Sequence, residues 1–85
     1  MVERMNENAL TSILKATSDP TRRGILTILV QEGPMRVGEI SSRFDMSLNA
    51  VSKHIKVLEA AGLAVRRTEW RDHIISADMT SLKVV

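Results

Sequence analysis

The sequence contains no cysteine, so neither disulfide bridges nor thiolate metal sites can support the fold. It has no apolar run of membrane-spanning length and no basic-then-apolar signal segment at its start. It also lacks a glycine loop that could cradle phosphates, and paired carboxylates beside a histidine on one face. These absences predict a cytoplasmic protein that is not an enzyme, takes no cofactor and binds no membrane.

The length of 85 residues limits the chain to one domain, which we expect to span residues 1–85. A core of this size rarely supplies more than about 3–5 kcal/mol of stability. Because no disulfide can add to that figure, self-association is the expected further source of stability.

The net charge of +2 is too small to indicate a nucleic-acid partner, but the charges are unevenly distributed. Residues 1–46 carry equal numbers of basic and acidic side chains, and residues 72–85 sum to −1. Residues 47–71 carry five basic and two acidic side chains, a surplus of three. A surplus confined to one segment is typical of a surface that neutralises phosphates.

Residues 37–63 have the pattern of two helices joined by a tight turn. The first helix is expected over Val37–Phe44, with Asp45 and Met46 in the turn. The second is expected over Ser47–Ala61, with the Ser47 side chain as its N-cap.

One face of this second helix is apolar and the other is polar and cationic. Val51, Ile55 and Leu58 repeat at helical spacing and predict a buried stripe. The opposite face carries Leu48, Asn49, Ser52, Lys53 and Lys56. Such a pair of helices is typical of a helix-turn-helix that presents side chains to the DNA major groove. An ordinary helical hairpin with a solvated outer face has the same pattern.

Two further helices are predicted before residue 37. The first, Glu7–Thr17, is amphipathic through Leu10, Ile13 and Leu14, and its stripe can pack on the domain, on a partner subunit or on both. The second runs from Pro20 to about Gln31, capped by Asp19 and closed by Gly33 and Pro34.

Arg22 and Arg23 lie in the first turn of that second helix, the unfavourable end for cations. Three placements are compatible with the sequence: in solvent, paired with Asp19, or near a phosphate.

A β-hairpin is predicted after the helix-turn-helix, from Leu63–Thr68 and His73–Ala77. A hairpin that follows a helix-turn-helix is a wing. Because side chains alternate along a strand, we expect four residues to face the helices: Leu63 and Val65 on the first strand, and Ile75 and Ala77 on the second. The fold class is therefore mainly α with a small β-hairpin, a winged helix-turn-helix. Its order is helix, helix, a brief strand at residues 35–37, helix, helix, two strands and a last helix from Asp78 or Thr80.

The chain resembles the arsenical-resistance repressor (ArsR) family of winged-helix transcription factors over residues 9–82. The runs that carry the resemblance are KATSDPTRR at 15–23, VGEI at 37–40, and residues 46–65 with VSKHIKVLEAAGLAV. The resemblance implies a dimeric repressor that binds a roughly palindromic operator. It also implies that the first helix and a C-terminal helix form the dimer interface, and that Ser47, Leu48, Asn49, Ser52 and Lys53 face DNA.

Three features depart from the family pattern. The positions where the best-known metal sensors of the family hold cysteines are occupied by Arg36 and Gly38, so that thiol site is absent. A second family site needs Asp, His and Glu on a final helix that this sequence does not complete. Family members reach the flanking minor groove or backbone with the wing, but here its tip has Trp70 where the family usually has glycine. This role is therefore transferred less securely than that of the helix, and Trp70 could instead make a packing or DNA-edge contact.

The two histidines do not predict a metal site. His54 lies on the inward edge of the second helix of the pair, where a lone histidine is more often a packing residue than a ligand. His73 lies in the wing, and together with Asp72 and Asp78 it lacks the short ligand spacing of zinc sites.

The sequence thus predicts a homodimeric transcriptional repressor that binds double-stranded DNA, without a metal. The alternative is a winged-helix protein-interaction module that binds no operator, which the low net charge and Leu48 favour slightly. Lys56 and Arg66 are expected to meet phosphate or water, and the resemblance implies that Arg67 and Arg71 reach the flanking minor groove or backbone. The residues assigned to DNA are Ser47, Leu48, Asn49, Ser52, Lys53, Lys56, Arg66, Arg67 and Arg71. The residues assigned to the dimer interface are Leu10, Ile13, Leu14, Leu82, Val84 and Val85.

Overall fold

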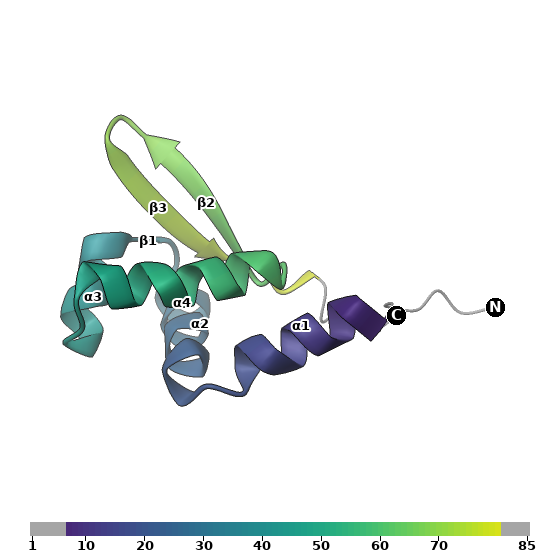
Figure 1. The fold of residues 1–85 in the computed structure, drawn as a ribbon. Helices are drawn as coiled ribbons and strands as arrows, with labels where there is room; N and C mark the ends of the chain where they lie inside the picture. Colours follow the sequence, from purple (N-terminus) through teal and green to yellow (C-terminus); the bar gives the residue numbers. More distant parts are fainter. Residues whose placement is uncertain (1–6, 81–85) are drawn as a thin grey trace.

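A computed structural model of the chain describes residues 7–80 and contains the predicted winged helix-turn-helix (Figure 1). The last helix predicted from Asp78 or Thr80 onward falls largely on residues 81–85, outside the described part. Thr80, the last described residue, has 3₁₀-helical geometry. The elements are α1 (Glu7–Thr17), α2 (Pro20–Glu32), β1 (Met35–Arg36), α3 (Val37–Phe44), α4 (Leu48–Ala60), β2 (Ala64–Glu69) and β3 (Asp72–Ala77).

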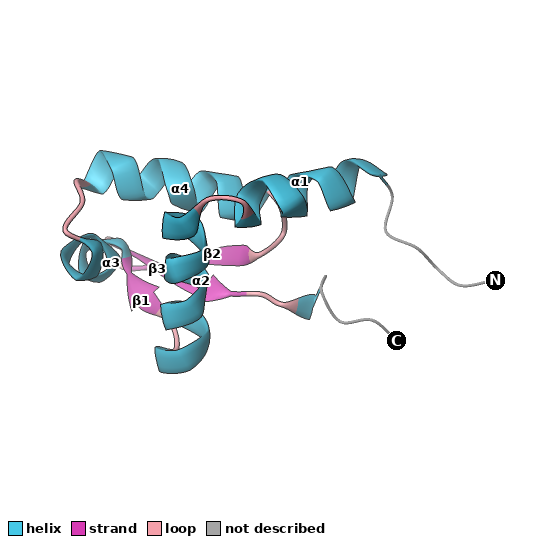
Figure 2. Ribbon diagram, turned by 90° about the horizontal axis from the view of Figure 1, so that it is seen from below, coloured by secondary structure: helices cyan, strands magenta, loops and turns pink. Residues whose placement is uncertain are grey.

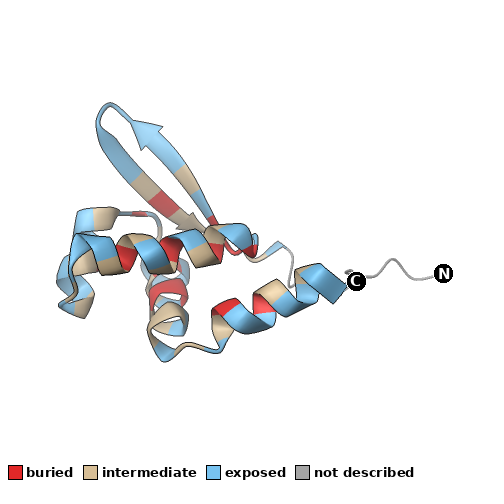
Figure 3. Cartoon of the chain, viewed as in Figure 1, coloured by how far each residue is buried: buried red, intermediate tan, exposed pale blue. Residues whose placement is uncertain are grey.

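The core lies between α4 and the other elements, as the red faces in Figure 3 show. Val51, Ile55 and Leu58 on α4 are each 0% exposed, which confirms the predicted stripe. They pack with one cluster of apolar side chains contributed by α1, α2, α3 and the sheet. Among residues 7–80, no helix is long and apolar enough to cross a bilayer.

The corner between α1 and α2 begins with the predicted N-cap. The Asp19 carboxylate accepts a hydrogen bond of 2.9 Å from the backbone N–H of Arg22. That bond lowers the pKa of Asp19 below its ordinary value, since it favours the charged carboxylate.

Arg23 is exposed to solvent, one of the three predicted placements, and Arg22 is half-buried; neither forms an ion pair with Asp19 within residues 7–80, and the placement near a phosphate stays a prediction. The Arg22 side chain donates to the carbonyl oxygens of Ala16 and Lys15, at 2.8 and 3.1 Å, and Arg23 donates to that of Thr17 at 2.7 Å. These carbonyls are at the C-terminal end of α1, the negative end of its dipole. The arginines are therefore at the unfavourable end of their own helix and the favourable end of the preceding one.

Packing of α3 on α2 depends on a close approach at Gly24. A Cβ at this position would lie 2.9 Å from a ring carbon of Phe44, so glycine makes room for the ring. On the surface, Arg43 of α3 bonds Glu32 of α2, and this contact lowers the pKa of Glu32.

The start of α3 and the turn into α4 are fixed by local hydrogen bonds. Glu39 accepts a bond of 3.1 Å from the backbone N–H of Arg36, a start signal that the sequence interpretation missed. Asp45 adopts left-handed geometry, with φ 51° and ψ 49°, as its place in the turn predicts. Ser47 then caps α4 by accepting a 3.1 Å bond from Ala50 N–H.

The end of α4 shows why one predicted strand face is wrong. Gly62, with φ 75°, closes the helix, and the N–H groups of Gly62 and Leu63 bond the carbonyls of Glu59 and Leu58 at 3.0 and 2.9 Å. Leu63 therefore belongs to the helix end, and the strand alternation begins one residue later. Ala64 is buried and Val65 is 50% exposed, so Val65 does not face the helices.

The three-stranded antiparallel sheet has the order β1-β3-β2 (Figure 2). Ile75 on the central strand β3 pairs with Met35 of β1 on one side and with Arg66 of β2 on the other. The buried Ile75 anchors this sheet to the core, and Ala77 is half-buried, so these two residues lie as predicted. The wing, which is β2, β3 and the loop between them, extends away from the helices beyond this point.

Replacing Asp19 with Ala should lower the free energy of unfolding at neutral pH, because the cap of α2 is removed. The folded-state pKa of Asp19 is lowered, so its contribution is complete above its ordinary pKa and is lost as the pH falls through the lowered value. Denaturation followed by circular dichroism across pH should show the wild-type advantage narrowing below about pH 4.

Asp19→Ser is the matched control, because serine keeps a cap oxygen without a titrating charge. The stability difference between the Ser and Ala variants should not change with pH. A wild-type advantage over the Ser variant that is constant across pH would contradict the charge argument.

Candidate nucleic-acid interface

The outward face of α4 is the best-defined polar surface of the chain. We call it the reading face, and it comprises Leu48, Asn49, Ser52, Lys53 and Lys56. All are exposed except Ser52, which is half-buried, and Leu48 is 58% exposed. Ser47, also assigned to DNA, is exposed but its hydroxyl oxygen is engaged as the helix cap. The buried stripe on the opposite side holds this face outward.

Ion pairs use two of the five cations in residues 47–71. Arg66 and Glu59 form two bonds, at 3.0 and 3.3 Å, and Arg67 pairs with Glu69 at 3.1 Å. Both acids of the segment are thereby neutralised. The other three cations of the segment form no ion pair with any residue of the described range 7–80. The surplus of three charges is therefore carried by three identified side chains, two on α4 and one in the wing loop: Lys53, Lys56 and Arg71.

A shallow groove of about 560 Å³ joins the reading face to the wing. Leu48 and Ser52 line it from α4, and Arg66 and Arg71 line it from the wing. The start of α3, residues 37–39, forms part of its wall. The structure thus brings together predicted residues from two separate stretches of the chain on one concave surface.

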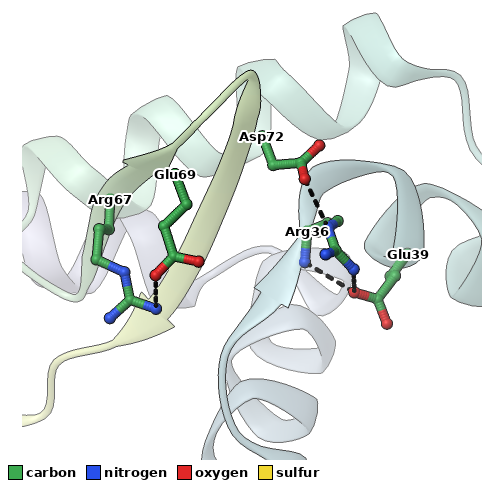
Figure 4. A network of polar contacts seen from close by, with 5 residues as sticks. All are labelled: Arg36, Glu39, Arg67, Glu69 and Asp72. Carbon is green, nitrogen blue, oxygen red and sulfur yellow. Dashed lines mark hydrogen bonds and ion pairs between the residues drawn. The ribbon is translucent and has the colours of Figure 1, made fainter.

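The orientation of the wing is fixed by contacts at both of its strands. On β2, Arg66 bonds Glu59 of α4 with side chains 27% and 29% exposed. On β3, Asp72 accepts a 3.1 Å bond from Arg36, which also lies 3.9 Å from Glu39 (Figure 4). The sequence predicts neither ion pair, because residues 7 and 36 positions apart carry no local signal of contact.

His54 is held by Arg22 and belongs to the packing between helices. A guanidinium nitrogen of Arg22 lies 3.2 Å from Nδ1 of His54, so Nδ1 is the acceptor and the proton of a neutral ring is on Nε2. One arginine therefore contacts the end of α1 and the middle of α4. His73 is exposed and lines the groove, and residues 7–80 contain no group of three His, Asp or Glu side chains placed to hold a metal.

The residues assigned to the dimer interface are only partly described. Leu10 and Leu14 on α1 are 47% and 59% exposed, so an apolar strip of α1 faces outward. Ile13 is 5% exposed and packs in the core of its own chain. The remaining three, Leu82, Val84 and Val85, lie outside the described residues.

A family model described as a helix-turn-helix domain matches residues 17–67, more than half of the chain. The transcriptional repressor SdpR of Bacillus subtilis is 40% identical over 52 residues, which are 61% of this chain and 57% of the repressor. The transcriptional activator HlyU of Vibrio cholerae is 30% identical over 86 residues, covering 99% of this chain and 79% of the activator. The crystal structure of the ArsR family transcriptional regulator RHA00566 superposes with a TM-score of 0.83 at 31% identity, covering 94% of this chain and 81% of that one.

The two ion pairs that hold the wing should differ in strength. Glu59–Arg66 is bidentate and half-buried, so a double-mutant cycle with Ala should give a coupling of about 1 kcal/mol in unfolding free energy. Arg36–Asp72 is exposed, at 59% and 51%, and should give only about 0.2–0.5 kcal/mol.

Chemical denaturation at low and at about 1 M salt checks both values, and the exposed pair should lose most of its coupling to screening. A stronger coupling for Arg36–Asp72 than for Glu59–Arg66 would show that the wing is anchored mainly through β1 rather than through α4.

Proposed function

We propose that this chain, which belongs to the ArsR family of winged helix-turn-helix transcriptional regulators, acts as a homodimeric repressor on a palindromic operator. The observation that carries the proposal is the reading face of α4, where Lys53 and Lys56 have no ion-pair partner within residues 7–80 and stand beside Asn49 and Ser52. A helix with such a face fits the major groove, where cations meet phosphates and amides or hydroxyls meet base edges.

The roles within this surface follow from chemistry and exposure. Asn49 suits adenine, Ser52 bonds bases without strong preference, and Leu48 can contact a thymine methyl group. Ser47 and Lys53 are also proposed to face DNA from the N-terminal half of α4 and its cap. Lys56 and Arg71 are proposed to contact phosphates. Arg66 and Arg67 act mainly through their ion pairs, since their charges are already compensated by Glu59 and Glu69.

Dimerisation is proposed through α1. Leu10 and Leu14 leave apolar surface uncovered, and a domain of this size gains stability by burying such surface against a second copy. Ile13 lies beneath that strip and would support it from within, and Leu82, Val84 and Val85 are proposed to extend it. Two α4 helices would then address half-sites about 10 bp apart in the cytoplasm.

Repression is favoured over activation on two grounds. The identity to the repressor SdpR is 40%, against 30% to the activator HlyU, although over a shorter segment. A dimer bound to an operator that overlaps the promoter represses by occupying it, and this needs no surface beyond the one that binds DNA. In a reporter strain, deletion of the gene should raise transcription from the operator promoter.

The exposed Leu48 and the compensated wing arginines favour a second candidate, a protein-interaction module without an operator. Specific DNA binding separates the two. Absent binding, or binding that does not depend on salt, would support the interaction module, since phosphate contacts release counterions.

Replacing both Asn49 and Lys53 with Ala should weaken specific binding, by about 1–3 kcal/mol for each hydrogen-bonded base contact that the variant can no longer make. Fluorescence anisotropy with a labelled duplex selected by the wild-type protein from a randomised pool measures the change at constant salt. Lys15→Ala is the control, because it removes the same charge from α1 rather than from α4. Wild-type affinity in the double variant would show that the reading face is wrongly assigned.

The wing arginines should differ in their effect on salt dependence. Arg71→Ala should reduce the slope of log K against log salt by about 0.9, the value for one phosphate contact. Arg67→Ala should reduce it less, because Glu69 already compensates that charge. Anisotropy titrations over a range of salt concentrations measure both slopes, and an unchanged slope for Arg71→Ala would remove this residue from the phosphate contacts.

A further inference from the structure

Trp70 is the most exposed large apolar side chain in the described part of the chain. It is 97% exposed, whereas the next values are 59% for Leu14 and 58% for Leu48. It is the first of the two loop residues that join β2 to β3, and it is the one tryptophan of the sequence. No contact within residues 7–80 accounts for a large aromatic ring at this point.

The backbone at Trp70 makes the choice of residue more unusual. Its φ is 57°, in the left-handed region where glycine is favoured and a bulky side chain is strained. Glycine is the preferred residue at the first position of a two-residue hairpin loop when that position has a positive φ. Neither the turn nor the core therefore explains the indole, and its surface is available to a partner.

The charges around the tip favour a partner contact that is not purely electrostatic. Glu69 pairs with Arg67, and the facing Asp72 pairs with Arg36 (Figure 4). Within the described range 7–80, Arg71 alone remains without an ion pair among the charged residues around the tip. The tip thus offers one free cation directly beside a flat apolar ring.

The position of the tip indicates which partner it meets. Arg71, next to Trp70, lines the same groove as Leu48 and Ser52 of the reading face. The wing stands beside α4 and reaches past the helices into solvent (Figure 1). A duplex seated on the reading face would therefore extend past the tip of the wing.

We propose that Trp70 is a DNA-contacting residue of the wing. Its indole lies against the sugars and base edges of the minor groove beside the half-site, while Arg71 contacts the adjacent phosphate. Apolar side chains of minor-groove-binding proteins enter this groove in a similar way. An aromatic ring provides contact area that does not depend on the donor and acceptor pattern of the bases. The inference rests on the proposed function and adds a contact that depends little on salt.

The chain provides its own probe for this contact, since the protein has one tryptophan and no tyrosine. Iodide quenching of the Trp70 emission should be strong in the free protein and should fall several-fold when a saturating selected duplex is added. Quenching that is unchanged by saturating duplex would overturn the proposal. Protection that grows with protein concentration without DNA would also overturn it, because a second copy of the chain would then cover the ring.

Trp70→Gly separates the contact from the geometry of the turn. Glycine suits the positive φ, so this variant keeps or improves the hairpin while it removes the ring. Its affinity for the selected duplex should fall about tenfold, with a salt slope equal to that of the wild type. Trp70→Phe should retain most of the affinity, and Arg71→Ala should lower the slope instead. Wild-type affinity in Trp70→Gly would overturn the proposal.

The inference and the proposed function can fail separately. Anisotropy of the labelled duplex reports wild-type binding independently of Trp70. If the wild type binds specifically and Trp70→Gly binds equally well, only the wing contact is wrong. If the wild type binds no duplex from the pool, the proposed function fails and the wing contact fails with it.

Discussion

Burial of Val51, Ile55 and Leu58 is the constraint on which the rest of the structure depends. An α-helix has 3.6 residues per turn, so fixing one stripe in the core also fixes which side chains are carried on the opposite side. Asn49 and Lys53 face outward for this reason alone. One helix is thus both the centre of the core and the proposed recognition surface, and a change that rotates this helix in the core also changes which side chains it exposes.

Charge compensation then selects among the cations that this frame leaves at the surface. The acids of residues 47–71 are placed so that Glu59 holds the wing on α4 and Glu69 holds Arg67 within the wing. The Glu59–Arg66 pair thus both orients the wing and compensates the charge of Arg66, while Arg71 keeps its charge uncompensated within residues 7–80. Within residues 47–71, the uncompensated positive charge therefore lies on the outward side of α4 and at the wing loop, the surface proposed to meet phosphates.

Local features of this fold could be predicted from the sequence, and the contacts between distant segments could not. The caps at Asp19 and Ser47 and the turn at Asp45 follow from the preferences of single residues, and they are confirmed. The face of Val65 was predicted wrongly because Leu63 ends the helix rather than starting the strand, a difference of one residue that reverses the alternation.

Contacts between distant segments depend on how the elements pack together. The bonds from Arg22 to α1 and to His54, and the Arg36–Asp72 pair, join residues that no local pattern connects. The helical period of the sequence predicts which positions of the reading face are exposed. That Glu59 neutralises Arg66 in the neighbouring wing can be seen only in the three-dimensional structure.

The connection between α4 and β2 has a consequence for how binding would be achieved. Gly62 and Leu63 close the helix with two hydrogen bonds, and the strand starts at the next residue, so no flexible linker separates the helix from the wing. Arg66 and Glu59 add a second tie across the same junction. If α4 and the wing both contact DNA as proposed, these ties hold them in one arrangement before binding, so little conformational entropy would be lost in bringing them to DNA together. A single residue inserted at this junction would leave each element folded but would misalign one with respect to the other.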